Sequence, residues 1–323
     1  MSIRRVGLVM HPACGRHDTG WGHSEHQGRL PAIVRALEQD TPALLEHMVH
    51  VEPQPIELDM LLRVHTPRHV DTIRACAAQA AHTGELQRLD PDTVVSAASW
   101  DAALAAAGCA WEAARMLYDG DADASFALAR PPGHHAMPDR AMGFCLFNNV
   151  AAAARAVQHR GAGRVLIVDF DVHHGNGTQD VFYEDPSVYF LSLHQSPWYP
   201  GTGSAQERGA GAGRNTTRNV PLAAGTDGPT YLRAMEDALS AVLDEFTPEM
   251  VLVSAGYDCM ARDPLGGLLL EPGDVHALVT MICEAASSAR ARTMCVLEGG
   301  YDPARTGTAV VQTIRALAGL PPL

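Results

Sequence analysis

The stretch from Val165 to Gly177 reads VLIVDFDVHHGNG, and it decides the fold. It opens with a short β-branched apolar run and ends in carboxylates, histidines and glycines. A run of this kind, bounded by glycines, is typical of a buried strand in a parallel sheet. In open α/β sheets, chemistry gathers at the carboxyl ends of the strands. The polar end of this stretch is therefore the first candidate for a functional site.

Asp171 and His173 lie two positions apart in this stretch. Because side chains of an extended segment alternate with a period of two, the spacing predicts that both point the same way. An Asp-x-His pair on one face is half of a metal site. The alternative is structural: Asp169 or Asp171 would cap a helix that follows the strand. Taken alone, the stretch favours neither interpretation.

The bulk composition predicts one large core. The chain has 323 residues, of which 46% are hydrophobic, and it contains no linker-like or low-complexity tract. We therefore expect a single domain over 1–323. The apolar segment after Arg4 and Arg5 is too short for a secretory signal, and no apolar run approaches the ~20 residues of a membrane helix. These features predict a soluble, cytoplasmic protein.

Cysteine usage and charge narrow the function classes. The seven cysteines are scattered without a CxxC pair, which indicates reduced thiols rather than disulfides or a thiolate zinc site. A formal net charge of −13 disfavours nucleic-acid binding and is compatible with cationic partners. The glycine-rich run GAGAGR at 209–214 follows no strand and opens no helix, so it lacks the context of a dinucleotide-binding motif and reads as a loop.

Predicted strands and helices alternate along the chain. Strands are expected at 4–10, 125–129, 165–170, 187–193, 250–254 and 293–297. Helices are expected at 30–38, within 56–82, from about Trp100 to Leu117, and at 147–159, 231–246, 272–290 and up to Leu317. This alternation predicts an α/β fold with a parallel sheet and right-handed crossovers.

Four of the predicted strands end in polar residues: RPPGHH at 130–135, DFDVHHGN at 169–176, SAGYD at 254–258 and EGGYD at 298–302. In a parallel sheet these ends lie along one edge. Asp258 is therefore the expected third metal ligand beside Asp171 and His173. Two carboxylates and one imidazole leave a coordination position open for water, which indicates a catalytic site. Such ligands suit Zn(II), and also Fe(II), Co(II) or Mn(II).

Acid–base and oxyanion groups are expected at the same edge. The tandem pair His134 and His135 follows a strand in a Pro-Gly turn, where it can transfer protons. Asp169 and Asn176 are the expected partners that fix the histidine tautomers, and only the Asp would raise the pKa of its partner. Tyr301 follows two glycines, and its hydroxyl can donate to an oxyanion. The alternative for Tyr301 is a buried core residue.

The segments RPPGHHA, GFCLFNNVA, VDFDVHHGNGTQ, LVSAGYD, DPLGG and LEGGY occur in this order along nearly the whole chain. With them the chain resembles the zinc-dependent histone deacetylase family, which includes acetylpolyamine amidohydrolases and bacterial deacetylase-like amidohydrolases. The resemblance implies the arginase/deacetylase α/β fold, with a mostly parallel sheet of about eight strands and a metal at its carboxyl edge.

The resemblance also implies residue roles. Asp171, His173 and Asp258 would be the zinc ligands. His135 would be the general base, and His134 would be its electrostatic partner, backed by Asp169. Tyr301 would polarise the acyl carbonyl together with zinc. Asn176 follows the pattern of class II-like and bacterial members, whereas class I members have Asp there. His174 is not expected to be a ligand.

A substrate tunnel and a second ion follow from the same resemblance. Gly143 and Phe144 would form one wall, and Trp198 or Tyr199 the other. A structural potassium ion would lie near Asp169, Asp171, His173, Ser192 and Leu193. Arg29 would lie beneath the metal, beside the path by which acetate leaves.

The acylated substrate is left open between acyl-lysine in peptides or proteins and acetylpolyamines. Leu265 stands where the eukaryotic polyamine-specific branch has an acidic residue, which favours acyl-lysine. Asp18 and Glu25 lie where bacterial polyamine enzymes have acidic residues, although a solvated surface is the favoured interpretation of both. A catalytically idle scaffold is a further alternative, but no expected ligand or Tyr301 is missing. Homo-oligomerisation is compatible with the sequence.

Overall fold

The computed structural model describes residues 4–323 and contains an eight-stranded sheet with the order β2-β1-β5-β10-β9-β6-β7-β8. All neighbouring strands of this sheet run parallel. The predicted α/β class is therefore confirmed. The strands are β1 (Val6–Val9), β2 (Met48–Val51), β5 (Ala124–Ala127), β6 (Val165–Asp169), β7 (Val188–Gln195), β8 (Thr217–Leu222), β9 (Met250–Ala255) and β10 (Arg292–Leu297).

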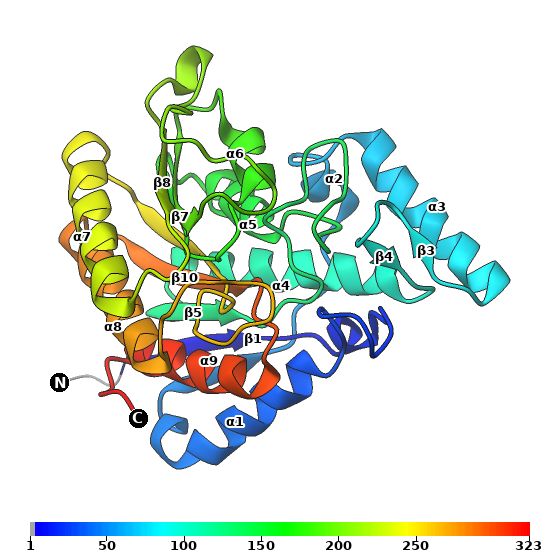
Figure 1. Cartoon of the computed structure of the whole chain (residues 1–323), viewed down its shortest axis with the longest axis horizontal. Helices are drawn as coiled ribbons and strands as arrows, with labels where there is room; N and C mark the ends of the chain where they lie inside the picture. Colours follow the sequence, from blue (N-terminus) through cyan, green and yellow to red (C-terminus); the bar gives the residue numbers. More distant parts are fainter. Residues whose placement is uncertain (1–3) are drawn as a thin grey trace.

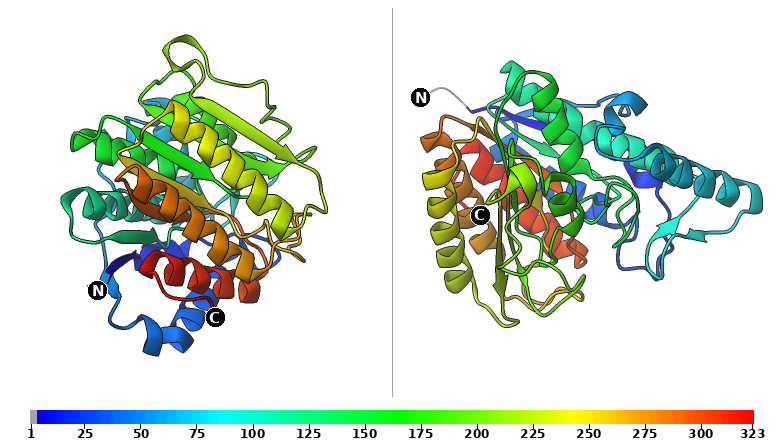
Figure 2. Two further views of the ribbon diagram at one scale, coloured as in Figure 1. Left: turned by 90° about the vertical axis from the view of Figure 1, so that its left-hand side faces the viewer. Right: turned by 90° about the horizontal axis from the view of Figure 1, so that it is seen from above.

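Helices cover both faces of the sheet (Figures 1 and 2). On one face α1 packs on α9, α9 on α8, and α8 on α7, whereas α4 and α5 pack together on the other face. The helices are α1 (Arg29–Leu44), α2 (Leu58–Leu61), α3 (Pro67–Thr83), α4 (Ser99–Asp119), α5 (Asn149–His159), α6 (Asn176–Phe182), α7 (Gly228–Glu245), α8 (Pro272–Ser288) and α9 (Pro303–Ala318). The result is the layered arrangement that buries a parallel sheet from both sides.

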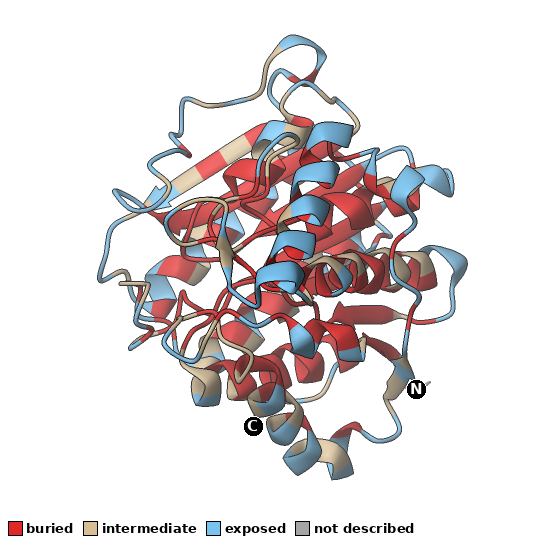
Figure 3. Cartoon of the chain, turned by 90° about the vertical axis from the view of Figure 1, so that its right-hand side faces the viewer, coloured by how far each residue is buried: buried red, intermediate tan, exposed pale blue. Residues whose placement is uncertain are grey.

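Most of the inner strands are buried along their whole length, as their apolar sequences predict. β5, β6, β7 and β9 contain only buried residues. Figure 3 shows the strands mostly in red, whereas the outward faces of the helices are pale blue. No helix among residues 4–323 is long and apolar enough to cross a membrane. A cytoplasmic location stays a prediction.

Several short elements were not predicted. β2 and β8 form the two edges of the sheet and are only partly buried, so their sequences MVHV and TRNVPL lack a continuous apolar run. The hairpin of β3 (Gln87–Arg88) and β4 (Val94–Val95) and the short helix α6 were also missed. β7 extends to Gln195, so His194 lies inside the strand and not after it. The GAGAGR run is a loop between β7 and β8 with one 3-10 turn, Gly211–Gly213.

Candidate active site

Four polar strand ends meet at the carboxyl edge of the sheet. They follow β5, β10, β9 and β6, which are consecutive neighbours in the strand order. His134 and His135 follow β5, Tyr301 follows β10, Asp258 follows β9, and Asp171 and His173 follow β6. Residues that are far apart in the sequence are therefore brought together, as the parallel arrangement predicts.

The closeness of Asp171 and His173 does not come from strand alternation, contrary to the prediction. β6 ends at Asp169, and the chain then bends. The Asp169 carboxylate accepts the amide of Asp171 at 3.1 Å, and the Asp171 carboxylate accepts the amide of His173 at 2.9 Å. Two successive side-chain-to-backbone turns of this kind replace the extended conformation. They bring His173 Nδ1 to 3.0 Å from Asp171 Oδ1.

Asp171, His173 and Asp258 form a buried cluster that fits a divalent cation. One ligand atom from each lies within 4.8 Å of the others. Asp258 Oδ2 is 3.2 Å from His173 Nδ1 but has no aligned hydrogen-bond donor among the described residues. Burial alone lowers the pKa of His173, but the adjacent carboxylates of Asp171 and Asp258 raise that pKa to about 10. The cluster thus attracts positive charge strongly, and its oxygen and imidazole donors suit zinc.

A glycine backbone allows the two carboxylates to approach each other. The amide of Gly299 donates to Asp171 Oδ2 at 2.9 Å. A Cβ atom at position 299 would overlap Asp258 Oδ2 and crowd Asp171 Oδ2. Any residue larger than glycine would therefore displace both carboxylates from their positions.

The histidine pair has two different second partners. His134 Nδ1 lies 2.9 Å from Asp169 Oδ2, whereas His135 Nδ1 lies 2.8 Å from Asn176 Oδ1. Burial alone lowers the pKa of His134, but the charges of Asp171 and Asp169 raise it well above its ordinary value. Burial, followed by the charges of His134 and His173, lowers the pKa of His135 well below its ordinary value. The arrangement therefore keeps His134 cationic and His135 neutral at the same pH.

Tyr301 presents its ring between two side chains. The guanidinium carbon of Arg29 lies 5.1 Å from the ring centroid, and the Phe144 ring packs edge-on at 5.7 Å. Burial and the nearby Asp258 raise the pKa of the phenol well above its ordinary value. Tyr301 therefore keeps its proton and can act as a hydrogen-bond donor. Arg29 also donates to the carbonyls of Glu298 at 2.6 Å and Gly300 at 2.8 Å.

The favoured interpretation of Glu25 as a solvated surface residue is wrong. Glu25 is fully buried because two arginines neutralise it. Its Oε1 lies 2.7 Å from Arg130 Nε and 3.1 Å from Arg29 NH1. Its carboxylate is therefore sealed beneath the site and does not face a substrate. Asp18 is exposed and accepts the amide of Gly20 at 2.9 Å.

A narrow cavity of about 200 Å³ leads to the cluster. The four residues expected in the tunnel wall line it, as does Leu265, together with one residue that the sequence did not single out. The lining is Asp92, His135, Gly143, Phe144, His173, Trp198, Tyr199, Leu265 and Tyr301. Phe144 has a φ of 67°, which is rare for a residue with a large side chain. Its amide donates to the Thr93 hydroxyl at 3.2 Å, which helps to hold this strained conformation at the wall.

Asp92 is the residue of the cavity that sequence reasoning missed. It lies in the turn DPDT, where the Asp90 carboxylate accepts the amides of Asp92 and Thr93 at 3.0 and 2.5 Å. Burial, followed by Asp90, raises the pKa of Asp92 to about 6. The turn signal is visible in the sequence, but its position beside the cavity depends on contacts with residues distant along the chain. For example, the Asp92 carbonyl contacts His23 Nε2 at 3.0 Å.

The residues expected around potassium lie on two adjacent strands. Asp169 pairs in register with Ser192, whose hydroxyl contacts His194 Nδ1 at 2.9 Å. The Leu193 carbonyl accepts the Tyr231 hydroxyl at 3.3 Å. A potassium ion there stays a prediction. His174 contacts the Thr202 hydroxyl at 2.8 Å and Gln179 Oε1 at 3.1 Å, so both ring nitrogens point away from the cluster.

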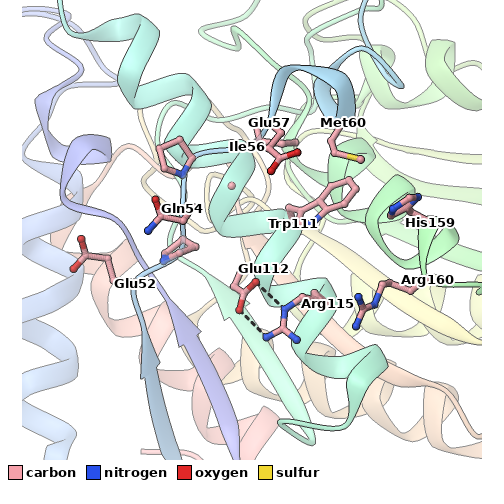
Figure 4. Close-up of a pocket in the computed structure, with 13 residues that line it drawn as sticks. Glu52, Gln54, Ile56, Glu57, Met60, Trp111, Glu112, Arg115, His159 and Arg160 are labelled. Atoms are coloured by element: carbon pink, nitrogen blue, oxygen red, sulfur yellow. Dashed lines mark hydrogen bonds and ion pairs between the residues drawn. The ribbon is translucent and has the colours of Figure 1, made fainter.

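A larger hollow of about 470 Å³ lies elsewhere, between the segment 52–57 and the helices α4 and α5 (Figure 4). Trp111 and Met60 contribute apolar surface to it. Arg115 is paired with Glu112 at 2.8 Å, and Arg160 with Asp119. Because both arginines are already paired with carboxylates, the smaller cavity with its possible metal-binding cluster is the better candidate for an active site.

Comparisons with known proteins find relatives over nearly the whole chain. A family model described as "Histone deacetylase domain" matches residues 23–317. The chain is 39% identical to "Histone deacetylase 10, chloroplastic" of Oryza sativa subsp. japonica, over 97% of this chain and 73% of that protein. It is 34% identical to "Histone deacetylase-like amidohydrolase" of Pseudomonas aeruginosa, over 97% and 80%. The crystal structure of the HDA15 HD domain superposes with a TM-score of 0.92 at 32% identity, covering 99% of this chain and 89% of that one.

Proposed function

The chain belongs to the histone deacetylase family of deacetylases and amidohydrolases, and on that premise we propose that it is a zinc-dependent hydrolase acting on acyl-lysine side chains. The proposed reaction converts R–NH–CO–CH3 and water into a free amine and acetate. One observation carries the proposal. The buried cluster of Asp171, His173 and Asp258 lies at the end of a narrow cavity whose wall also contains His135 and Tyr301.

The cluster would hold the zinc ion through Asp171, His173 and Asp258. A divalent cation held there supplies Lewis acidity, which polarises an acyl carbonyl and acidifies water. The amide of Gly299 fixes one oxygen of Asp171, and the amide of Val172 donates to Asp258 Oδ1 at 2.9 Å. These bonds hold the carboxylates in place before a cation arrives.

His135 would move the protons. Its Nδ1 faces the Asn176 oxygen at 2.8 Å and therefore carries the hydrogen, which leaves Nε2 as the proton acceptor. The low pKa of His135 keeps this nitrogen free to take a proton from the attacking water. The same proton then goes to the departing amine. The cationic His134, held by Asp169, would stabilise the negative charge that develops nearby.

Tyr301 would stabilise the oxyanion. Its hydroxyl keeps its proton because burial raises the pKa of the phenol. A fixed donor of this kind is worth most when it points at the oxygen on which charge develops. Arg29 and Phe144 hold the ring from two sides, so little reorganisation is needed during the reaction.

The shape of the cavity favours a linear acyl-lysine stem. Phe144, Trp198, Tyr199 and Leu265 make its wall largely apolar, which suits an alkyl chain. Leu265 offers no charge to a distal ammonium group. The burial of Glu25 between Arg29 and Arg130 also removes one of the two carboxylates that would have suited a polyamine.

Asp92 supports deacetylation of acetylpolyamines as a second candidate function. Its carboxylate lies beside the cavity and would be ionised above a pH of about 6. There it could pair with the distal ammonium of a polyamine, or accept a backbone amide of a peptide. The two roles differ in chemistry, because an asparagine amide oxygen can still accept an N–H group but cannot neutralise an ammonium.

Side-by-side kinetics of the zinc-loaded protein on an acetyl-lysine peptide and on acetylputrescine test both candidates. We expect a higher kcat/KM for the peptide, and we expect Asp92→Asn to leave most of this activity. A higher kcat/KM for acetylputrescine that collapses in Asp92→Asn would favour the second candidate instead. Turnover of neither substrate would refute the deacetylase proposal in both forms.

A further inference from the structure

A chain of hydrogen bonds runs along one side of the tunnel. The indole Nε1 of Trp198 donates to the carbonyl of Leu265 at 2.8 Å. The amide of Leu265 donates to Asp263 Oδ1 at 2.9 Å, and the amide of Tyr301 donates to Asp263 Oδ2 at 2.7 Å. Trp198, Leu265 and Tyr301 all line the cavity, whereas Asp263 lies behind them. One carboxylate therefore joins the Tyr301 backbone to the wall that the substrate stem would contact.

Asp263 is built into this position. Only 7% of it is exposed, and each of its carboxylate oxygens has a backbone donor. The preceding Arg262 has a φ of 71°, a conformation that costs energy for a residue with a side chain. The following Pro264 has no amide hydrogen, so the next available donor is that of Leu265. The loop thus bends sharply to place the carboxylate between two separate segments.

The Tyr301 backbone needs an anchor of this kind. It follows Gly299 and Gly300, and Gly300 has a φ of 115°, so the preceding residues restrict the backbone less than residues with side chains would. Arg29 holds the carbonyls on this segment, at Glu298 and Gly300. On the donor side, the Gly299 amide is bound to Asp171, and the bond from the Tyr301 amide to Asp263 anchors the residue that carries the phenol. Without it, the ring could shift relative to the metal cluster although all catalytic groups would be present.

We propose that Asp263 is a positioning residue that holds Tyr301 and the Leu265–Trp198 wall as one unit, so that the wall and the oxyanion donor are placed together. The inference rests on the proposed deacetylase function. It assigns to Asp263 no contact with the substrate or the metal. Its effect on the reaction is therefore exerted through the placement of Tyr301 and should appear in kcat.

The test compares wild type with Asp263→Asn. The asparagine side chain is isosteric, but it offers one acceptor oxygen for two backbone donors and presents its own N–H group to the other. We expect kcat on an acetyl-lysine peptide to fall at least about tenfold, because a small misplacement of a catalytic group has a large effect on rate. KM, zinc content and the melting temperature should change little. Asp123→Asn is the matched control, because the Asp123 carboxylate accepts the amide of Arg5 at 2.8 Å, far from the site.

A second variant removes the outermost hydrogen bond of the series, at a half-exposed side chain whose replacement does not threaten folding. Trp198 is 46% exposed, and Trp198→Phe keeps an aromatic ring while removing the indole donor to Leu265. The assay uses the acetamide of a short alkylamine, which is too short to reach the outer wall. We expect kcat to fall on this substrate too, because the effect passes through Leu265 and Asp263 to Tyr301. A residue that merely contacts the substrate would affect only longer substrates.

Different results would contradict the role of Asp263 and the proposed deacetylase function. A kcat of folded Asp263→Asn within about twofold of wild type would overturn the inference, as would a loss of kcat that is fully matched by a loss of bound zinc. If Asp263→Asn does not fold, an unchanged kcat of Trp198→Phe on the short substrate overturns it. A wild-type protein that hydrolyses no acyl amide contradicts the proposed function instead.

Discussion

Glu25→Gln removes the negative charge that lies between two buried guanidinium groups, those of Arg29 and Arg130. Arg130 and Arg29 each lie within 3.1 Å of the Glu25 carboxylate, and all three side chains are fully buried. Glutamine keeps the size and an acceptor oxygen but supplies no charge. Two cations would then lie close together in a fully buried site, so we expect the folded state to be destabilised.

The expected size follows from the burial of the ion pairs. Removing one partner of a buried ion pair typically costs about 3–5 kcal/mol, because the remaining charge is left without compensation. Unfolding entropy near the midpoint is about 2.1 cal/mol/K per residue, or about 0.7 kcal/mol/K for 323 residues. A loss of about 3–5 kcal/mol therefore lowers the melting temperature by about 4–7 °C.

The pH dependence provides a second signature. Burial alone raises the pKa of Glu25, but Arg130 and Arg29 outweigh it and lower the pKa below its ordinary value. The unfolded chain thus binds a proton at Glu25 more readily than the folded chain does. The stabilisation is complete at neutral pH and is lost as the pH falls through the carboxyl range. The difference between wild type and Glu25→Gln should shrink in the same range.

Thermal unfolding followed by circular dichroism at several pH values measures both effects. Glu38→Gln is the matched control, because Glu38 is an exposed carboxylate on α1 and should leave the melting temperature unchanged. Equal melting temperatures of Glu25→Gln and wild type at neutral pH would refute the electrostatic reasoning.

Three further predictions concern the site. Tyr301→Phe and His135→Ala should each lower kcat at least about 100-fold, as expected for the loss of an oxyanion donor or a general base, and full activity in either would contradict its role. Gly299→Ala should lower zinc affinity, measured by competition with a chelator, because the added Cβ overlaps Asp258 Oδ2. In the wild-type protein, treatment with the chelator should abolish activity, and added zinc should restore it. For a cationic substrate, KM should fall as the pH rises through about 6, where Asp92 ionises, and Asp92→Asn should remove this step in the pH profile.

The sequence predicted what depends on local pattern. The buried strands β5, β6, β9 and β10 are short apolar runs, and their polar ends predicted where the cluster would form. The edge strands β2 and β8 escaped prediction because an edge strand is partly solvated and needs no continuous apolar run. The end of β6 at Asp169 was also not predicted, because it depends on a hydrogen bond that the Asp169 carboxylate accepts from the amide of Asp171.

Features that depend on distant contacts could not be predicted from local pattern. Glu25 resembles a surface residue in its polar loop, and only the convergence of Arg29 and Arg130 accounts for its burial. Asp92 carries an ordinary turn signal, and its position beside the tunnel depends on how the turn packs against His23. The role of Asp263 is likewise hidden, because its partner Tyr301 lies in a different segment. The pattern of polar strand ends predicted the three residues of the cluster but not these supports.

The strand order has a consequence for the time at which the protein becomes competent during synthesis. β2, β1 and β5 form one half of the sheet, β6, β7 and β8 form the other, and the late strands β10 and β9 lie between them. A chain synthesised as far as β8 contains His135, Asp171 and His173. The two halves of its sheet are not yet connected, because β9 and β10 have not been made. Asp258 and Tyr301 arrive with the joining strands. Ribosome-bound intermediates that stop before Tyr301 should therefore be inert, and zinc should stabilise the chain only after Asp258 has emerged beside β6, because a ligand stabilises the states that can bind it.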